Sequence, residues 1–417
     1  MRILKLTRGT VKQLLAARRA HDARARRVAA RILGDVRRRG DAALFGWTRK
    51  LDGVDLRKEG VWIEARAIEA AEKHATPEFV RAVEHAAKNV RQVAEKQLPR
   101  GWTMEVEAGV MISQIVRPIE TIGCYVPGGR FALISTLVMT VVPAKVAGVE
   151  RIVVVCPNPS KEFLAAASLL GVREIARIGG AQAIGALAYG TRSVPRVDKI
   201  FGPGNQFVTA AKQLASNDCA IDLPAGPTEA IVLGEKGNPK WIAADLIAQA
   251  EHAPDAGSFL VTTSVELARR VRGEVATQLK QLPEANFART SLRRTGAILL
   301  ASSVAQAIEF VNRFAPEHLS LPEGSTELLD RIRAAGTVFI GPWSAQPLGD
   351  YASGSNHVLP TSGWARARGG LSAADFVKCV SVQEIDGTGF TGLAGDVQTM
   401  ARAEGLLAHA KAIEVRR

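Results

Sequence analysis

The chain has 417 residues, 47% of them hydrophobic, so it is long enough to bury a large core and to form two or more domains. Its formal net charge is +13, but only 5% of its residues are aromatic and no known nucleic-acid-binding motif is present. This composition favours a charged surface facing solvent over a nucleic-acid interface, and it also suits a protein that binds an anionic dinucleotide.

The N-terminus and the cysteines bear on where the protein works. Residues 1–8 lack the apolar stretch of a signal peptide, and no window approaches the roughly 20 apolar residues of a membrane span. The cysteines form no CxxC pair, which predicts reduced thiols and argues against a Cys-ligated metal; they are Cys124, Cys156, Cys219 and Cys379. We therefore expect a cytoplasmic protein without a membrane partner.

The region before about Glu105 is rich in Ala, Arg and Glu and is predicted to be helical. Its arginines have no aromatic residues between them, which is typical of a solvated helix face; they are Arg18, Arg19, Arg24, Arg26, Arg27, Arg31, Arg37, Arg38 and Arg39. The same surface location is expected for three histidines of this region, His21, His74 and His85.

The middle of the chain alternates short β-branched strands with amphipathic helices. Three strand–helix units are predicted, with strands at 151–157, 174–180 and 197–204 and helices from about 161, 181 and 205. A second trio of strands follows at 258–262, 297–301 and 337–341. Two similar halves predict an α/β protein with two Rossmann-like, doubly wound modules. Residues 222–229, with two prolines and a glycine, predict a crossing between domains, and the residues from Ala373 predict a small separate tail.

A dinucleotide site normally has a GxGxxG loop, but none follows these strands. The nearest substitutes lie at a strand end or a helix start, where backbone N–H groups hold phosphate; they are 125–129, 179–182 and 202–205. Glycines at such turns are equally common as structural punctuation, so both interpretations stay open.

The segment 349–361 combines a carboxylate, an imidazole and two glycines without the apolar period of a strand or a helix, which is typical of a ligand site. Four histidines each have a carboxylate or carboxamide neighbour: His252 with Gln249 and Glu251, His318 with Glu317, His357 with Asp350, and His409 with Glu404. A helix from near Trp241 to Pro254 would present Gln249 and His252 on one face. With Asp350 and His409 they would offer two nitrogen and two oxygen ligands, a set that suits a zinc-type metal, although spacing alone does not select it.

Longer motifs point to one family. The chain closely resembles histidinol dehydrogenases over essentially its whole length, through YVPGG at 125–129, GGAQAI at 179–184, GPGN at 202–205, PAGPTE at 224–229, QAEH at 249–252, APEHL at 315–319, the stretch 349–361, and Glu404 with His409. The resemblance implies NAD-dependent oxidation of L-histidinol through L-histidinaldehyde to L-histidine, the last two steps of histidine biosynthesis.

The resemblance also implies roles for residues. One zinc per subunit would be held by Gln249, His252, Asp350 and His409, with His409 coming from the partner subunit of a homodimer. His318 would be the general base and Glu317 would activate water. The substrate would be contacted by the four zinc ligands and by His318, Thr228, His357 and Glu404. NAD would be contacted by Tyr125, Gln182 and Asn205.

The implied domains are an N-terminal helical segment at 1–20, a first Rossmann-like domain at 21–124 plus 229–371 with the metal and substrate, a second at 125–228 with NAD, and a tail at 372–417 that reaches the partner's site.

One departure from the family and three alternatives remain. Thr228 stands where the family usually has serine, which keeps the hydroxyl and adds a methyl group. The chain could instead be a paralogous zinc- and NAD-dependent dehydrogenase of another polar alcohol, such as a sulfonated diol, although Glu404 suits a cationic substrate better. A nucleic-acid-binding protein on this scaffold is suggested only by the arginines. Glu317 and His318 could also be a salt-bridged Glu and a capping His.

Overall fold

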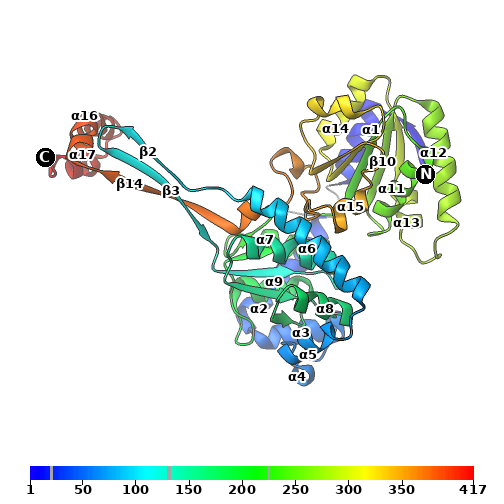
Figure 1. Cartoon of the computed structure of the whole chain (residues 1–417), viewed down its shortest axis with the longest axis horizontal. Coiled ribbons are helices and arrows are strands. Elements are labelled where there is room, and N and C mark those ends of the chain that lie inside the picture. The colour runs from blue at the N-terminus through cyan, green and yellow to red at the C-terminus, as the bar shows by residue number, and fades with distance from the viewer. Residues whose placement is uncertain (19–21, 129–132, 224–225) are drawn as a thin grey trace.

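The computed structural model describes residues 1–18, 22–128, 133–223 and 226–417. It contains two α/β bodies and an arm that projects from one of them (Figure 1). Within the described residues, the six-stranded body comprises 1–18 and 226–351, the five-stranded body comprises 22–98, 119–223 and 372–376, and the arm comprises 99–118 and 377–417, while the segment 352–371 runs between the two bodies and packs on both. Arg19, His21, Gly129, Pro224 and Ala225, which carried some of the predictions, lie outside the described residues.

The six-stranded body is built on an all-parallel sheet. Its strands, in spatial order, are β1 (Arg2–Lys5), β11 (Ala297–Leu300), β10 (Gly257–Thr262), β9 (Glu229–Leu233), β12 (His318–Leu321) and β13 (Thr337–Ile340). Its helices are α1 (Arg8–Ala17), α11 (Pro239–Ala250), α12 (Val265–Leu279), α13 (Ala288–Arg294), α14 (Val304–Phe314), α15 (Gln346–Tyr351) and the 3₁₀ helix η1 (Thr326–Arg331). Separate apolar clusters fill the two faces, as a parallel sheet requires.

The five-stranded body also has an all-parallel sheet. Its strands are β6 (Glu174–Ala176), β5 (Arg151–Val155), β4 (Thr121–Tyr125), β7 (Lys199–Phe201) and β8 (Ala220–Ile221). One face is covered by α2 (Asp22–Arg39), α3 (Asp41–Asp52), α9 (Gly180–Tyr189) and α10 (Gln206–Ala215), and the other by α5 (Ala65–Glu72), α6 (Pro77–Gln97), α7 (Ile134–Val146) and α8 (Lys161–Leu169). Two short helices also belong to this body, α4 (Leu56–Glu59) and η3 (Ala373–Phe376), whereas η2 (Trp364–Arg366) lies in the segment 352–371, where Ala365 packs with Ala315 and Ala334 of the six-stranded body.

Both sheets share a strand order. Numbered along the chain, and with β1 left aside, each sheet reads 3-2-1-4-5. The order reverses between β4 and β7 in one sheet and between β9 and β12 in the other, and doubly wound proteins form ligand sites at the carboxyl ends of the strands beside such switch points.

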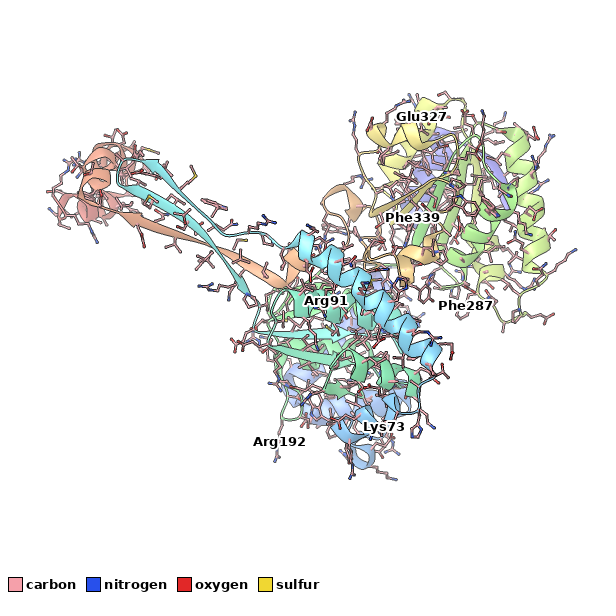
Figure 2. The ribbon with its side chains drawn as sticks, in the orientation of Figure 1. Lys73, Arg91, Arg192, Phe287, Glu327 and Phe339 are labelled. Atoms are coloured by element: carbon pink, nitrogen blue, oxygen red, sulfur yellow. The ribbon has the colours of Figure 1, made fainter. Side chains whose placement is uncertain are left out.

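The arm is an antiparallel ribbon that ends in two helices. β3 (Val110–Pro118) pairs with β2 (Trp102–Glu107) on one side and β14 (Val377–Ile385) on the other, and α16 (Gly387–Ala403) and α17 (Leu407–Glu414) follow. The outer part of the arm stands clear of both bodies, with side chains on all sides of the ribbon (Figure 2). Several large apolar side chains of the arm are exposed: Trp102, Met104, Val106, Met400 and Leu407.

The α/β class with parallel sheets is confirmed, as are the six predicted strands and the helices that follow the first three. Three central strands, β4, β9 and β12, were not predicted. The region before Glu105 is helical apart from β1 and the start of β2.

The sheets group the chain differently from the predicted domain boundaries. Residues 22–97 and β4 belong with the five-stranded sheet, because the buried side of α2 packs against α9 and α10. Residues 1–18 join the six-stranded body through the pairing of β1 with β11. The tail is not separate, since β14 pairs with β3.

Most of the surface predictions are confirmed, and Arg18 is the exception. The described arginines of α2 are exposed, while its other side buries Ala25, Ala29, Ile32, Leu33 and Val36. His74 and His85 are exposed, and the four cysteines are free. Among the described residues, no helix is long and apolar enough to cross a membrane.

Candidate active site

The predicted catalytic residues lie at the amino-terminal edge of the six-stranded sheet. β9 and β12 are neighbouring parallel strands with His318 opposite Ala230, so the residues just before them, Thr228 and Glu317, also lie side by side. The Thr228 hydroxyl donates to Glu317 Oε2 over 2.5 Å, and the Glu229 backbone N–H donates to the same oxygen over 2.9 Å. Two adjacent strand starts therefore fix the Glu317 carboxylate.

His318 is the first residue of β12 and is only 4% exposed. Its Nδ1 lies 3.5 Å from Glu317 Oε2 and its Nε2 lies 3.5 Å from Asp350 Oδ1, but neither nitrogen has a hydrogen-bond partner within the described residues. Burial of the imidazole lowers its pKa, but the two carboxylates outweigh burial and raise the pKa to about 10. The ring is thus held between two carboxylates with both nitrogens available.

The ring of Phe339 fixes one side of the site. It stacks on His318 with the ring centres 5.9 Å apart, and it belongs to β13 of the six-stranded body (Figure 2). Gly349 packs directly against it, because a Cβ at position 349 would lie 2.6 Å from the Phe339 ring. This close approach brings Asp350 to the imidazole and explains one of the two glycines in the polar segment.

His357 positions Asp350 through a hydrogen bond to its backbone. Its Nδ1 donates to the Asp350 carbonyl oxygen over 2.8 Å, and its Nε2 lies 3.0 Å from the hydroxyl of Thr136 on α7. Burial lowers the pKa of His357, which favours the neutral ring that this pair of contacts needs. His357 therefore connects the polar segment to the five-stranded body as well as to the site.

Gln249 and His252 reach the same edge from α11. Gln249 is buried, and its Nε2 donates to the Thr228 hydroxyl, which completes a chain from Gln249 through Thr228 to Glu317. The helix ends at Ala250 with Glu251 as its C-cap, so His252 follows the helix instead of lying on it as predicted. α11 packs against α15, and His252 is one of the residues near Asp350 that lower the pKa of its carboxyl, against the effect of burial.

Glu404 and His409 do not join these residues within one chain. Glu404 is the C-cap of α16 and His409 lies on α17, both are exposed, and the two helices form the far end of the arm (Figure 1). Accordingly, no group of three or more His, Cys, Asp or Glu side chains that could hold a metal occurs in the part of the chain that the structure describes.

The predicted NAD contacts lie at the carboxyl edge of the five-stranded sheet. Tyr125 ends β4, and its buried hydroxyl accepts from the Gly180 N–H at the start of α9 over 3.1 Å. Burial raises the pKa of Tyr125. Gln182 donates to Asp52 over 2.9 Å, while its Oε1 is buried without a partner among the described residues. Asn205 caps α10 by accepting from Phe207 and Val208.

The glycine-rich turns at this edge have packing explanations. A Cβ at Gly128 would lie 2.6 Å from Pro157, and one at Gly179 would lie 2.7 Å from it. Gly180 has a positive φ of 61°, which favours glycine. These glycines therefore allow tight turns, while α9 and α10 still direct their N-termini to this edge of the sheet.

Sequence reasoning missed two buried ion pairs next to these sites. Arg18 pairs with Glu229, beside Thr228, and Lys212 pairs with Asp222, beside the 202–205 turn. Arg18 was assigned to the solvated arginine face, but its side chain is only 11% exposed. One sequence feature could have revealed these carboxylates: Asp222 and Glu229 lie at the two ends of the segment 222–229, which was predicted to cross between domains.

Known proteins resemble the chain along its whole length. A family model described as histidinol dehydrogenase matches residues 15–417. A histidinol dehydrogenase of Methanothermobacter thermautotrophicus is 46% identical over 393 residues, covering 92% of each chain, and one of Aquifex aeolicus is 45% identical over 388 residues, covering 93% of this chain and 91% of its own. The crystal structure of histidinol dehydrogenase from Elizabethkingia anophelis superposes with a TM-score of 0.91 at 36% identity, covering 100% of this chain and 98% of that one. The chain therefore belongs to the histidinol dehydrogenase family.

Proposed function

We propose that the protein oxidises L-histidinol to L-histidine through L-histidinaldehyde, with NAD+ as the oxidant in both steps and His318 and Glu317 as the catalytic residues. The observation that carries this proposal is the buried Glu317–His318 pair, whose imidazole nitrogens have no hydrogen-bond partner among the described residues and whose carboxylate is fixed by Thr228 and Glu229. Each nitrogen lies 3.5 Å from a carboxylate oxygen, longer than a usual N–H···O hydrogen bond, so the two carboxylates orient the ring for a proton transfer.

His318 and Glu317 divide the proton chemistry. In each oxidation His318 takes the proton of the reacting hydroxyl, first that of the alcohol and then that of the hydrated aldehyde, as a hydride passes from carbon to NAD+. The aldehyde must be hydrated before the second step, and the Glu317 carboxylate takes a proton from the attacking water. The Thr228 hydroxyl, which donates to Glu317, orients that carboxylate.

Residues around His318 would supply part of the ligand set of a divalent metal, and His409 of a second subunit would complete it, because the described residues of one chain form no complete site. Three carboxylates gather here, those of Glu229, Glu317 and Asp350, and Arg18 pairs with the first of them. Gln249, His252 and Asp350 share this edge and offer two oxygens and a nitrogen, which suits zinc. A bound zinc would anchor and orient the substrate's nitrogen donors. It would also offset the carboxylate charge, which favours a neutral His318 that is ready to accept a proton.

A homodimer would complete the site. His409 and Glu404 lie on the projecting arm, and a second subunit's body would receive them as metal ligand and substrate contact. The exposed apolar side chains of the arm support this proposal, because Trp102, Met104 and Leu407 would be covered by a partner.

NAD+ would bind the five-stranded body. Tyr125, Gln182 and Asn205 line up along its carboxyl edge, where the N-termini of α9 and α10 favour phosphate. Thr136 at the start of α7, after β4, lies within hydrogen-bond distance of His357, so this edge adjoins the polar segment 349–361.

The test is NADH formation from L-histidinol by the zinc-loaded protein. Two NADH per histidinol are expected, with His318→Asn losing both and Glu317→Gln stopping after the first and releasing aldehyde. The matched controls are His85→Asn and Glu78→Gln, two exposed residues of α6. A protein that holds zinc and binds NAD+ but leaves histidinol unchanged contradicts the proposal, and screening of other polar alcohols, including a sulfonated diol, would then identify a paralogous dehydrogenase.

A further inference from the structure

The chain passes between the two bodies three times. The first crossing follows α1 and begins at Arg18, the second runs from Asp222 to Glu229, and the third is the segment 352–371 that follows α15. The six-stranded body carries Glu317 and His318 and the five-stranded body carries the proposed NAD edge, so the crossings set how the two halves of the site face each other.

The buried carboxylate of Glu229 connects all three crossings through hydrogen bonds. Glu229, 5% exposed, accepts from Arg18 Nε over 2.5 Å and also from Arg18 Nη2. The same carboxylate accepts from the Ser362 backbone N–H over 3.2 Å. Thr361 and Gly226 connect the second and third crossings directly, because the Gly226 N–H donates to the Thr361 hydroxyl.

Arg18 is held on every side. Beyond its two bonds to Glu229, its Nη1 donates to the Phe314 carbonyl oxygen over 2.6 Å. Its guanidinium lies 3.8 Å from the centre of the Phe314 ring. A planar guanidinium serves a bidentate bond and a ring contact together, which a lysine would not reproduce.

The same residue continues into the catalytic machinery. The Glu229 backbone N–H donates to Glu317 Oε2, and Thr228 is its neighbour in sequence. A shift of Glu229 would therefore move the crossings and the Glu317 carboxylate together.

We propose that Arg18 and Glu229 are positioning residues that lock the three crossings and so fix the NAD-binding body against the body that carries Glu317 and His318. The inference rests on the proposed function, in which a hydride passes between groups carried by the two bodies. Such a transfer is sensitive to misplacement, since about 1 Å costs on the order of 100-fold in rate.

Arg18→Met is the first test. We expect kcat for histidinol to fall by about 10- to 100-fold while KM for histidinol and the zinc content stay within about twofold. Histidinol deuterated at its carbinol carbon should show a larger isotope effect on kcat than with the wild type, because hydride transfer becomes slower relative to the other steps. Arg18→Lys should recover only part of the rate. The matched control is Arg151→Met, which removes an Arg–Glu pair confined to β5 and β6.

Hydrogen exchange tests the lock without turnover. Peptides covering 226–229 and 361–363 should exchange faster in Arg18→Met, while peptides from the cores of both sheets exchange as in the wild type. If Arg18→Met does not fold because it leaves Glu229 buried and unpaired, Arg18→Met/Glu229→Gln removes both charges and should fold with the same loss of kcat.

Three results would overturn the inference: a folded Arg18→Met or double variant with wild-type kcat, a lower kcat with an unchanged isotope effect, or unchanged exchange at the crossings. A wild-type protein that does not oxidise histidinol refutes the proposed function instead, and the exchange experiment then still decides whether the lock exists.

Discussion

The buried pair Lys212–Asp222 gives a quantitative prediction for the five-stranded body. The side chains are 3% and 0% exposed, and they hold the turn that begins at Gly202 from both sides. Lys212 Nζ donates to the Gly202 carbonyl oxygen over 2.8 Å, and Asp222 Oδ2 accepts from the Gly202 N–H, also over 2.8 Å. Gly202 has a φ of 110° and packs against the Tyr125 carbonyl, so no side chain fits there.

Lys212→Met would leave the Asp222 carboxylate buried without its cation. Removing one partner of a buried ion pair costs about 3–5 kcal/mol. The N–H groups of Gly202 and Leu223 still donate to the carboxylate, so we expect a loss near the lower end, about 3 kcal/mol. At about 2–4 °C per kcal/mol for a domain of this size class, the melting temperature should fall by about 6–12 °C.

Thermal unfolding at one fixed protein concentration measures the shift. Lys411→Met is the matched control, because the Lys411–Glu414 pair is 62% and 53% exposed and should contribute less than about 1 kcal/mol. Lys212→Met/Asp222→Asn should melt above the single variant, since it removes the unpaired charge. A Lys212→Met protein that melts within about 2 °C of the wild type, or above the double variant, would refute the reasoning.

Three further changes have defined outcomes. Thr228→Ala breaks the chain from Gln249 to Glu317 and should slow histidinaldehyde oxidation about tenfold in stopped-flow NADH traces, whereas Thr228→Ser should stay near wild type. Asp245→Asn tests a carboxyl whose pKa is raised to about 6 by burial. The wild-type fold loses stability as the pH rises from about 4 to 6, because the buried carboxyl then becomes charged. The variant should therefore melt at a higher temperature than the wild type at pH 7.5 and at the same temperature at pH 4. Chelation of the metal should abolish NADH formation, and added zinc should restore it. The circular dichroism spectrum should stay unchanged, because the buried apolar clusters do not include the site. Activity that survives complete metal removal would contradict a zinc role.

The sequence named residues of the candidate site from separate local motifs, but it did not predict how these residues contact one another. Glu317, His318, Asp350 and Gln249 were identified from local motifs, and the structure brings them to one edge of the six-stranded sheet. The chain of hydrogen bonds through Thr228 was not predictable, because its partners lie 21 and 89 residues away and meet only when β9 and β12 pair. Those strands were missed because their first residues belong to polar motifs that read as loops.

Two further errors concern Arg18 and the arm. Arg18 has the same sequence surroundings as the exposed arginines of α2, and only the folded position of Glu229 distinguishes it. The strand β2 is exposed along its whole length, yet residues 102–107 alternate apolar and polar side chains, which is the pattern of a strand. The sequence therefore carried a signal for the start of the arm, and it was overlooked because the residues before it are helical.

A mixed-dimer experiment tests the central claim, an active site shared between two subunits, most directly. Asp350→Asn alters the body and His409→Ala alters the arm, so each variant alone should be inactive on L-histidinol. In a dimer of one of each, the intact body of the His409→Ala subunit receives the intact arm of the other, which makes one complete site in two. Random mixing gives such dimers half the time, so about one quarter of the wild-type rate of NADH formation should return. Mixed dimers that form but recover no activity would contradict the shared site.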